Sequence, residues 1–204
     1  MQRAHDTLVP MPVAAIILAA GASRRLGEPK QLIVYRGETL LARAARLARE
    51  SGAAPVVVVL GAHLQNIREA IDFNEAVPVV NELWEQGISS SIHAGLEALD
   101  AHAPGAPGVL LMSCDQPRLD AEHLRTLMET FAAQGASCIV ASVYAGVQGV
   151  PAVFPRALFS RLRALQGDQG ARSLMAQQLC PVITLPFEGG EVDIDVPADL
   201  TQLD

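Results

Sequence analysis

A glycine-rich loop carrying three cations lies near the start of the chain. Residues 18–31 read Leu-Ala-Ala-Gly-Ala-Ser-Arg-Arg-Leu-Gly-Glu-Pro-Lys-Gln, directly after an apolar run. Glycines let backbone N–H groups approach a phosphate closely, and the cations can neutralise its remaining charge. The loop lacks the Gly-Lys-Ser/Thr of a P-loop, and Ser23 stands where the second glycine of Gly-x-Gly-x-x-Gly belongs. We interpret it as a phosphate-binding loop; the alternative is a turn with solvated charges. The glycines are Gly21 and Gly27, and the cations are Arg24, Arg25 and Lys30.

The elements that must position this loop alternate between short apolar runs and helical patterns. Such a rhythm predicts a three-layer α/β/α sandwich with a mostly parallel, mixed central sheet, and ligands are expected at the carboxyl ends of the strands. The turn expected near residue 144 makes the sheet mixed. Strands are predicted at 13–19, 55–60, 77–80, 109–113, 137–143 and 182–185, and helices at 39–50, 63–71, 89–101, 120–133, 155–165 and 171–179, with Thr39, Ser89 and Asp120 as N-caps.

A single carboxylate follows the apolar run 109–113. Asp115 comes just past this predicted strand, and Pro117 prevents the strand from continuing. A carboxylate at a strand's carboxyl end is well placed to hold a metal on a bound phosphate, because Mg²⁺ typically takes one or two carboxylates plus phosphate oxygens and water. Asp115 is therefore a candidate magnesium ligand; the alternative is a turn or helix cap.

A second acidic cluster lies near the end of the chain. In a strand, Asp193 and Asp195 would point to the same side, where paired carboxylates repel unless a cation stabilises them. Asp195 can also cap a short helix that starts at Pro197. We expect Asp193 to bind metal, with Asp195 capping or joining it, and a short closing helix over 192–200.

The glycine-rich loop resembles the nucleotidyltransferase signature Leu-Ala-Ala-Gly-x-Ser-x-Arg-x-Gly-x-x-Lys. Cys-Asp-Gln-Pro at 114–117 is similar to the molybdenum-cofactor nucleotidyltransferases, whose corresponding aspartate binds magnesium. Residues 193–200 resemble that family's Asp-Ile-Asp-Thr-Pro-Glu-Asp-Leu, with Val196 and Ala198 as departures. The resemblance covers roughly 13–202 and implies a Rossmann-like nucleotidyltransferase fold. The signature positions are Leu18, Ala19, Ala20, Gly21, Ser23, Arg25, Gly27 and Lys30.

Two further regions resemble substrate-binding segments of the same family. Residues 81–96 are similar to its base-side loop, and the hydroxyls of Ser90 and Ser91 at a helix N-terminus are the candidates for contacting base or phosphate. Trp84 either stacks on a ring or packs in the core. Residues 148–154 and 165–172 resemble segments that border the acceptor. Their candidate residues are Gly149, Pro151, Asp168 and Arg172, and Arg172 either holds a phosphate or pairs with Asp168.

The resemblance implies a molybdenum cofactor cytidylyltransferase. Such an enzyme joins CMP from CTP to molybdopterin, releases pyrophosphate and uses Mg²⁺; a molybdenum hydroxylase or its maturation chaperone is a further expected partner. The acceptor phosphate is already anionic and needs no general base. Lys30 and Arg25 would stabilise the leaving pyrophosphate, and magnesium on Asp115 and Asp193 would orient the α-phosphate.

Several alternatives stay open. A guanylyltransferase of the same cofactor usually has Gly where Ala20 stands, a methylerythritol phosphate cytidylyltransferase usually has a longer gap before Pro29, and sugar-1-phosphate nucleotidyltransferases are generally longer. A non-catalytic carrier of the cofactor is the alternative of another class. The intact set of Lys30, Asp115 and Asp193 favours catalysis over carriage.

Composition limits the remaining choices. The chain has 204 residues, of which 50% are hydrophobic, and a net charge of −7, so we expect one domain over 12–204, a tail over 1–11 and no nucleic-acid partner. No apolar stretch reaches the ~18 residues of a membrane span. Cys114, Cys138 and Cys180 are far apart and indicate neither a disulfide framework nor a zinc site, so a reducing, cytoplasmic location is expected.

Overall fold

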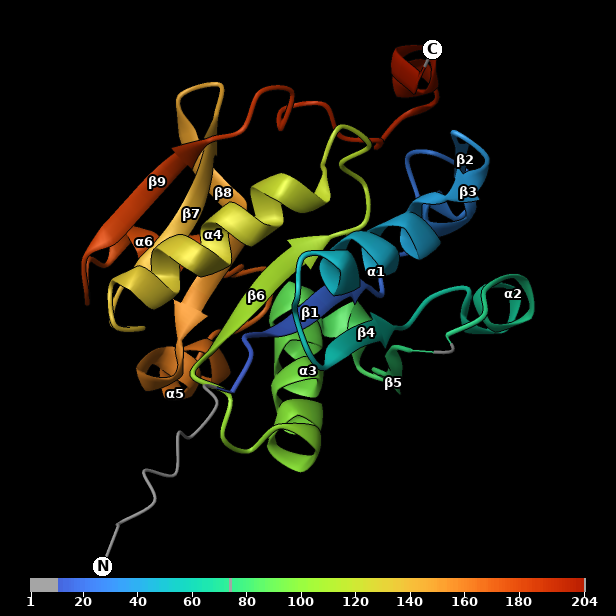
Figure 1. Cartoon of the computed structure of the whole chain (residues 1–204). Helices are drawn as coiled ribbons and strands as arrows, with labels where there is room; N and C mark the ends of the chain where they lie inside the picture. The colour runs from blue at the N-terminus through green and yellow to red at the C-terminus, as the bar shows by residue number, and fades with distance from the viewer. Residues whose placement is uncertain (1–10, 74, 204) are drawn as a thin grey trace, which may run out of the picture.

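A seven-stranded sheet with the strand order β5-β4-β1-β6-β8-β7-β9 forms the centre of the molecule (Figure 1). The computed structural model describes residues 11–73 and 75–203. Strand β8 runs antiparallel to both β6 and β7, whereas the pairs β5–β4, β4–β1, β1–β6 and β7–β9 are parallel, so the sheet is mixed and mostly parallel, as predicted. The strands are β1 (Ala14–Ala19), β4 (Val56–Leu60), β5 (Val77–Val80), β6 (Gly108–Ser113), β7 (Ile139–Tyr144), β8 (Val147–Pro155) and β9 (Val182–Pro186).

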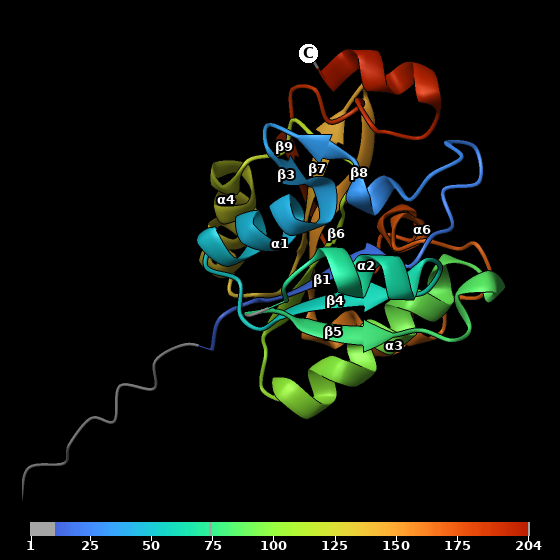
Figure 2. The same cartoon turned by 90° about the vertical axis from the view of Figure 1, so that its right-hand side faces the viewer.

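Helices cover both faces of the sheet, which confirms the three-layer α/β fold. Figures 1 and 2 show α1 and α4 on one face and α3 and α5 on the other. The α-helices are α1 (Leu40–Glu50), α2 (Leu64–Ala70), α3 (Ile88–His102), α4 (Ala121–Ala133), α5 (Phe159–Arg163) and α6 (Arg172–Ala176). Short 3₁₀ helices span Lys30–Leu32, Trp84–Gln86, Arg156–Leu158 and Pro197–Leu203, and a small hairpin pairs β2 (Val34–Tyr35) with β3 (Glu38–Thr39).

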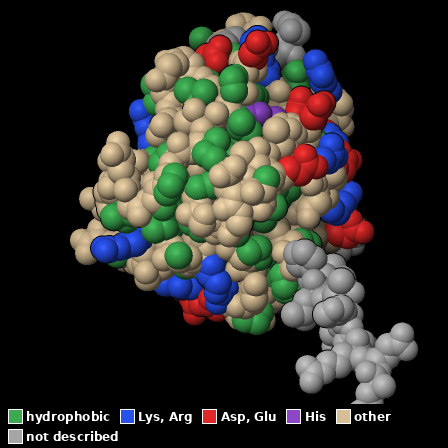
Figure 3. Space-filling model, turned by 60° about the vertical axis from the view of Figure 1, so that its left-hand side comes forward, with side chains coloured by type: hydrophobic (Ala, Val, Ile, Leu, Met, Phe, Trp, Pro, Cys, Tyr) green, Lys and Arg blue, Asp and Glu red, His purple; other side chains and the backbone are tan. Residues whose placement is uncertain are grey.

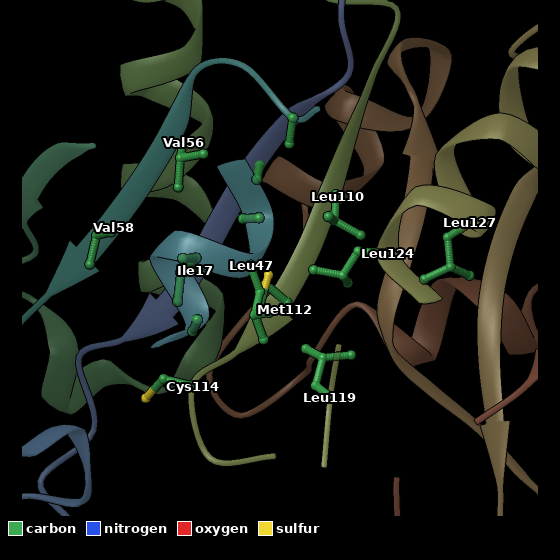
Figure 4. Close-up of a cluster of buried hydrophobic side chains, with 14 of the residues drawn as sticks. Ile17, Leu47, Val56, Val58, Leu110, Met112, Cys114, Leu119, Leu124 and Leu127 are labelled. Carbon is green, nitrogen blue, oxygen red and sulfur yellow. The ribbon is translucent and has the colours of Figure 1, made fainter. Parts of the chain in front are cut away.

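Alternating side chains of β1 enter two separate hydrophobic cores. Ile17 packs with α1 and α4 on one face, in the cluster drawn in Figure 4, and Ile16 packs with α3 on the other. Helix α3 lies close to β1 because it presents Gly95 there: a Cβ at Gly95 would come within 2.7 Å of the Ile16 side chain. Burial on both faces explains why the central strands read as continuous apolar runs.

Most predicted elements are present within a few residues of their predicted bounds, but three details were wrong. The closing helix begins at Pro197 instead of 192, and residues 192–196 are neither helix nor strand. Helix α6 ends at Ala176, short of the predicted 179. Ser89 is inside α3, whose N-cap is Gly87, while Thr39 and Asp120 cap α1 and α4 as predicted, accepting bonds from Ala42 N and His123 N. The predicted tail over 1–11 lies outside the described residues, except for Met11.

The surface view in Figure 3 shows one face on which uncharged side chains cover the middle and acidic and basic side chains lie mainly near the edges. Within residues 11–73 and 75–203, none of the helices combines the length and the apolar character needed to cross a membrane.

Candidate functional site

A cleft of about 680 Å³ opens at the carboxyl ends of β1 and β6. This is where the parallel sheet was expected to place a ligand. One side of the cleft is made by the glycine-rich loop, and the other by the β7–β8 hairpin and the loop before α6. The start of α3 adjoins that last loop, since the Ser89 N–H donates to the Gly167 carbonyl at 3.1 Å. The lining includes Leu18, Ala20, Gly21, Ala22, Ser23, Arg24, Lys30, Trp84, Glu85, Gly87, Ile88, Ser91, Ser113, Asp115, Tyr144, Gly149, Val150, Asp168, Gly170, Ala171 and Arg172.

A charged cluster centred on Lys30 forms the floor of this cleft. The Lys30 ammonium contacts the carboxylate of Asp115 and lies 3.1 Å from Oδ1 of Asp195. Arg25 reaches the same Asp195, with 2.6 Å between Nη2 and Oδ2. Burial by itself would lower the pKa of Lys30, but the adjacent Asp115, assisted by Asp195, outweighs it and raises that pKa. Lys30 is therefore a fixed cation held by two carboxylates that are 85 and 165 residues away in sequence.

Local hydrogen bonds hold the glycine-rich loop open toward the cleft. The Lys30 N–H donates to Oγ of Ser23, at 3.1 Å, which closes the loop on itself. Gln31 is fully buried, and its Nε2 donates to the carbonyls of Ala19 and Gly21, at 2.7 and 2.9 Å. A Cβ placed on Gly21 would meet no atom within 4 Å, so the space beside this glycine belongs to the cleft.

A third carboxylate, Asp193, lies on the segment that carries Asp195. Partial burial and the negative charges of Asp195 and Asp115 raise the pKa of Asp193. An excess of negative charge of this kind fits a divalent cation bound by two carboxylates together with phosphate oxygens. Among residues 11–73 and 75–203, no group of three or more His, Cys, Asp or Glu side chains is arranged to hold a metal ion by itself.

Asp195 does not cap the final 3₁₀ helix. The carboxylate of Asp199 takes that role, accepting from the N–H groups of Asp195 and Val196 at 2.9 and 2.8 Å. The capping prediction was therefore wrong for Asp195, because its side chain turns back to Arg25 and Lys30 instead. Asp195 cannot be assigned to this pairing from the sequence, since its partners come from a distant loop.

The two candidate serines of α3 have different surroundings. Ser91 lines the cleft, while Ser90 faces a neighbouring pocket, with its Oγ 2.9 Å from the Leu83 carbonyl and 2.8 Å from that of Gly87. Asn81 Nδ2 donates to both hydroxyls, at 2.9 and 3.0 Å. The Ser90 hydroxyl is thus engaged in holding the start of α3, and Ser91 is the hydroxyl that the cleft presents.

Trp84 packs against the protein at the rim of the cleft, and its stacking on a ring stays a prediction. It lines the cleft, and it also packs on Gly61, where a Cβ would come within 2.7 Å of the Trp84 side chain and 2.9 Å of the Ala20 Cβ. The indole therefore holds the Ala20 end of the glycine-rich loop against β4.

The opposite side of the cleft is shaped by Tyr144. Its hydroxyl donates to the Val150 carbonyl at 3.1 Å, and a Cβ on Gly149 would come within 2.2 Å of that hydroxyl. Phe187 contacts the Tyr144 ring edge-on and stacks on His123, with ring centroids 6.0 and 4.7 Å apart. Gly149 is therefore required by a tertiary contact.

The acceptor residues predicted from sequence fall on this side of the cleft, with one exception. Asp168 and Arg172 line the cleft together with Gly149, while Pro151 is buried behind them. Within the described part of the chain, no carboxylate lies within salt-bridge distance of Arg172, so the alternative of a pair with Asp168 is not what the structure shows.

Four side chains that shape the site were not predicted from the sequence. Asn81 opens the segment that resembles the base-side loop, but no role was assigned to it, and Tyr144 gave no signal. Gln31 and Gln116 each follow a charged site residue directly, and this adjacency was the available signal. Gln116 Nε2 donates to the carbonyls of Gly190 and Val150, at 3.0 and 3.3 Å.

Comparison with known proteins agrees with this arrangement. Residues 15–182 match the family described as "MobA-like NTP transferase domain". The chain is 32% identical to nicotine blue oxidoreductase of Paenarthrobacter nicotinovorans, covering 97% of this chain and 98% of that protein. It is also 32% identical to a probable molybdenum cofactor guanylyltransferase of Opitutus terrae, over 86% of each chain.

A solved structure shares the fold over almost its whole length. The crystal structure of Rv0371c from Mycobacterium tuberculosis superimposes with a TM-score of 0.82 at 31% identity, covering 95% of this chain and 97% of that one. A second crystal structure of Rv0371c is a complex with manganese, with a TM-score of 0.78, 29% identity and coverage of 95% and 98%. The chain therefore belongs to the family of MobA-like NTP transferase domains, and its fold is that of a nucleotidyltransferase.

Proposed function

We propose that this protein transfers CMP from CTP to the phosphate of molybdopterin, giving molybdopterin cytosine dinucleotide and pyrophosphate. The observation that carries the proposal is the Lys30 cluster, which lies in one cleft with the glycine-rich loop and the segments around Gly149 and Arg172. A cation fixed beside a phosphate-type loop supports phosphoryl chemistry, and the opposite side leaves room for a second substrate. We assign these roles to one domain over residues 12–204.

The chain's own residues can align the substrates and neutralise charge. Backbone groups from Ala20 to Ser23 would surround the triphosphate, and Lys30 with Arg25 would stabilise the charge that grows on the leaving pyrophosphate. Arg172, which lines the cleft without a carboxylate partner among the described residues, would hold the acceptor phosphate through paired hydrogen bonds. The acceptor needs no general base, since its phosphate is already anionic.

Asp115 and Asp193 are the residues we assign to a bound Mg²⁺. They come from segments that are joined by the bond from the Ile194 N–H to the Asp115 carbonyl. Partial burial, and after it the negative charges of Asp195 and Asp115, raise the pKa of Asp193, and a cation would relieve the part that is due to these charges. When bound, the metal would neutralise triphosphate charge and help to orient the α-phosphate. Asp195 is held by Arg25 and Lys30, so we assign it to positioning those cations and not to the metal.

We propose CTP over GTP as the donor because Ala20 occupies the position where guanylyl-transferring relatives usually carry glycine. Its methyl group narrows the space beside the loop, and a pyrimidine needs less room than a purine. Backbone donors and Ser91 would meet the polar edge of the base. The similarity to a probable guanylyltransferase keeps guanylyl transfer as the alternative.

The deciding experiment measures pyrophosphate release with each NTP, with and without molybdopterin. Release with CTP that depends on molybdopterin supports the proposal. A larger kcat/KM for GTP would replace cytidylyl by guanylyl transfer. Tight binding of the cofactor without pyrophosphate release from any NTP would favour a carrier, which could hand the cofactor to a molybdenum hydroxylase or its maturation chaperone.

The full-length similarity to nicotine blue oxidoreductase adds a candidate activity of another class. Reduction of nicotine blue by an added nicotinamide reductant can be followed by absorbance, with the Lys30→Ala variant as a control. The Lys30 cluster favours transfer, since a lysine and carboxylates beside a glycine-rich loop suit a phosphate that carries a bound metal ion. Reductase activity in the absence of nucleotide transfer would reverse this choice.

A further inference from the structure

Gln116 joins three segments of the site, although the reaction proposed above does not use it. Its side chain is only 8% exposed, and it directly follows Asp115. Its Nε2 donates to the Gly190 carbonyl at 3.0 Å and lies 3.3 Å from the Val150 carbonyl. One amide group thus links the Asp115 segment to the acceptor side of the cleft and to the loop that leads to Asp193.

The backbone beside Gln116 makes a second link to that loop. The Ile194 N–H donates to the Asp115 carbonyl at 3.1 Å, and the Ile194 side chain is fully buried. Gly190 and Ile194 lie on either side of Asp193 in sequence. The two bonds therefore bracket residues 191–193 and fix where the Asp193 backbone lies relative to Asp115.

The hydrogen bonding of Gln116 indicates that its NH₂ group is what matters. Within the described structure, the NH₂ group of Gln116 is hydrogen-bonded, whereas its buried Oε1 has no partner. A buried oxygen without a partner is unfavourable, so the donors must compensate for it. An apolar side chain of the same size would fill the space without that oxygen. Packing alone therefore does not account for a glutamine here.

Gln31 has the same arrangement next to Lys30. Its Nε2 donates to two backbone carbonyls, those of Ala19 and Gly21, and its Oε1 has no partner among the residues that the structure describes. Lys30 and Asp115, which contact each other, are thus each followed by a buried glutamine that ties neighbouring backbone in place. The same arrangement at Gln31 and Gln116 supports a positioning role for both side chains.

We propose that Gln116 is a positioning residue that holds Asp193 at a fixed distance from Asp115 and thereby sets the affinity of the site for its divalent cation. The inference rests on the proposed function only in assigning these two carboxylates to the metal. Because Val150 lies in the same network, Gln116 also holds the acceptor side in register with the metal side.

Mn²⁺ is the probe for the test, measured by the electron paramagnetic resonance signal of the free ion with CTP present. Gln116→Met keeps the length of the side chain and removes both donors, and Gln116→Glu keeps the shape and replaces the donors by oxygen. Both are expected to raise the Kd for Mn²⁺ about 10–100-fold, the range for partners that orient metal ligands. Amide hydrogen exchange at Ile194 should accelerate in the metal-free variants, while exchange in β1 and β4 stays slow.

Ser142→Ala is the matched control. Ser142 is fully buried in the β7–β8 hairpin. In the part of the chain that the structure describes, its hydroxyl bonds the Pro151 carbonyl at 2.6 Å and His123 Nε2 at 2.8 Å, and neither bond reaches residues 190–194. Its loss should lower stability and leave Mn²⁺ affinity and Ile194 exchange unchanged.

The outcomes separate this inference from the proposed function. Gln116 variants that bind Mn²⁺ as tightly as the wild type, or that lose no more affinity than Ser142→Ala, would overturn it. Wild-type protein that binds no Mn²⁺ with CTP would overturn it as well. Wild-type protein that binds Mn²⁺ normally but releases no pyrophosphate would overturn the proposed function alone.

Discussion

The two sides of the cleft are built in different ways. The nucleotide side is dominated by one short segment, residues 18–31, whose charges meet carboxylates on the cleft floor. The acceptor side comes from the β7–β8 hairpin and the loop before α6, and it is held by ring contacts and by bonds to carbonyls. The first side depends on local backbone and charge, and the second on how distant segments pack.

Glycine illustrates the difference. Gly21 leaves open space on the nucleotide side, whereas Gly149 on the acceptor side makes room for the Tyr144 hydroxyl of the protein itself. A glycine that borders open space in a cleft indicates room for a ligand. A glycine that borders a side chain of the protein indicates a packing requirement of the fold. The same substitution should therefore have different consequences on the two sides.

Lys30→Ala should have the largest effect, because it removes the fixed cation of the nucleotide side. Loss of one preorganised charge-stabilising group typically costs about 10²–10³-fold in kcat, and we expect that decrease in pyrophosphate release. The substitution also removes the shared partner of Asp115 and Asp195 and could therefore destabilise the fold. Circular dichroism and the thermal midpoint of unfolding control for this effect. A folded variant with near-native kcat would remove Lys30 from the reaction.

Asp115→Asn and Asp193→Asn test whether the two segments share one metal. We expect Asp115→Asn to reduce activity about 100-fold and Asp193→Asn about tenfold, the range in which metal-site partners act. In both variants the Mg²⁺ concentration for half-maximal rate should rise. If the Mg²⁺ concentration for half-maximal rate is the same in Asp193→Asn as in the wild type, Asp193 does not bind the metal.

Gly149→Ala and Gly21→Ala compare the sides directly. Overpacking costs about 1–3 kcal/mol, so Gly149→Ala should lower the free energy of unfolding by this amount and raise KM for the acceptor. Gly21→Ala should leave stability unchanged and raise KM for CTP about tenfold, since the added methyl group fills ligand space. Equal losses of stability would contradict the distinction between the two glycines.

The smallest effect concerns the pH dependence of the acceptor side. Burial lowers the pKa of His123, opposed by Asp120, and His123 bonds Ser142 and stacks on Phe187. A lowered pKa in the folded state means that this stabilisation is complete above the unfolded value of about 6.5 and is lost as the pH falls below it. His123→Gln should therefore lose less stability than the wild type between pH 7 and 5, measured by urea unfolding. Equal decreases of the free energy of unfolding in the two proteins would show that His123 does not contribute to this pH dependence.

The redox and nucleophilic roles that a cysteine beside the site could suggest are disfavoured by the structure. Cys114 lies in the core cluster of Figure 4, and burial raises the pKa of its thiol to about 12. The thiolate is the reactive form, so Cys114 is expected to be inert at neutral pH. Its neighbour Asp115 is the residue that reaches the cleft.

The sequence by itself determined the alternation of strands and helices, the glycine-rich loop and the position of Asp115 after β6. These features depend on hydrophobic period and on neighbouring residues, which a sequence displays directly. The sequence also placed Lys30 and Asp115 at the carboxyl edge of the sheet, because adjacent parallel strands end at that edge.

Only the tertiary structure decided the partners of those residues. Asp195 joins Lys30 and Arg25, and Gln116 reaches Val150 and Gly190, only because the fold brings together segments that are far apart in the sequence. A side chain such as Asp195 can cap a helix or pair with a cation at similar local cost. The choice is made when the fold brings one partner within reach, and no local pattern records that approach.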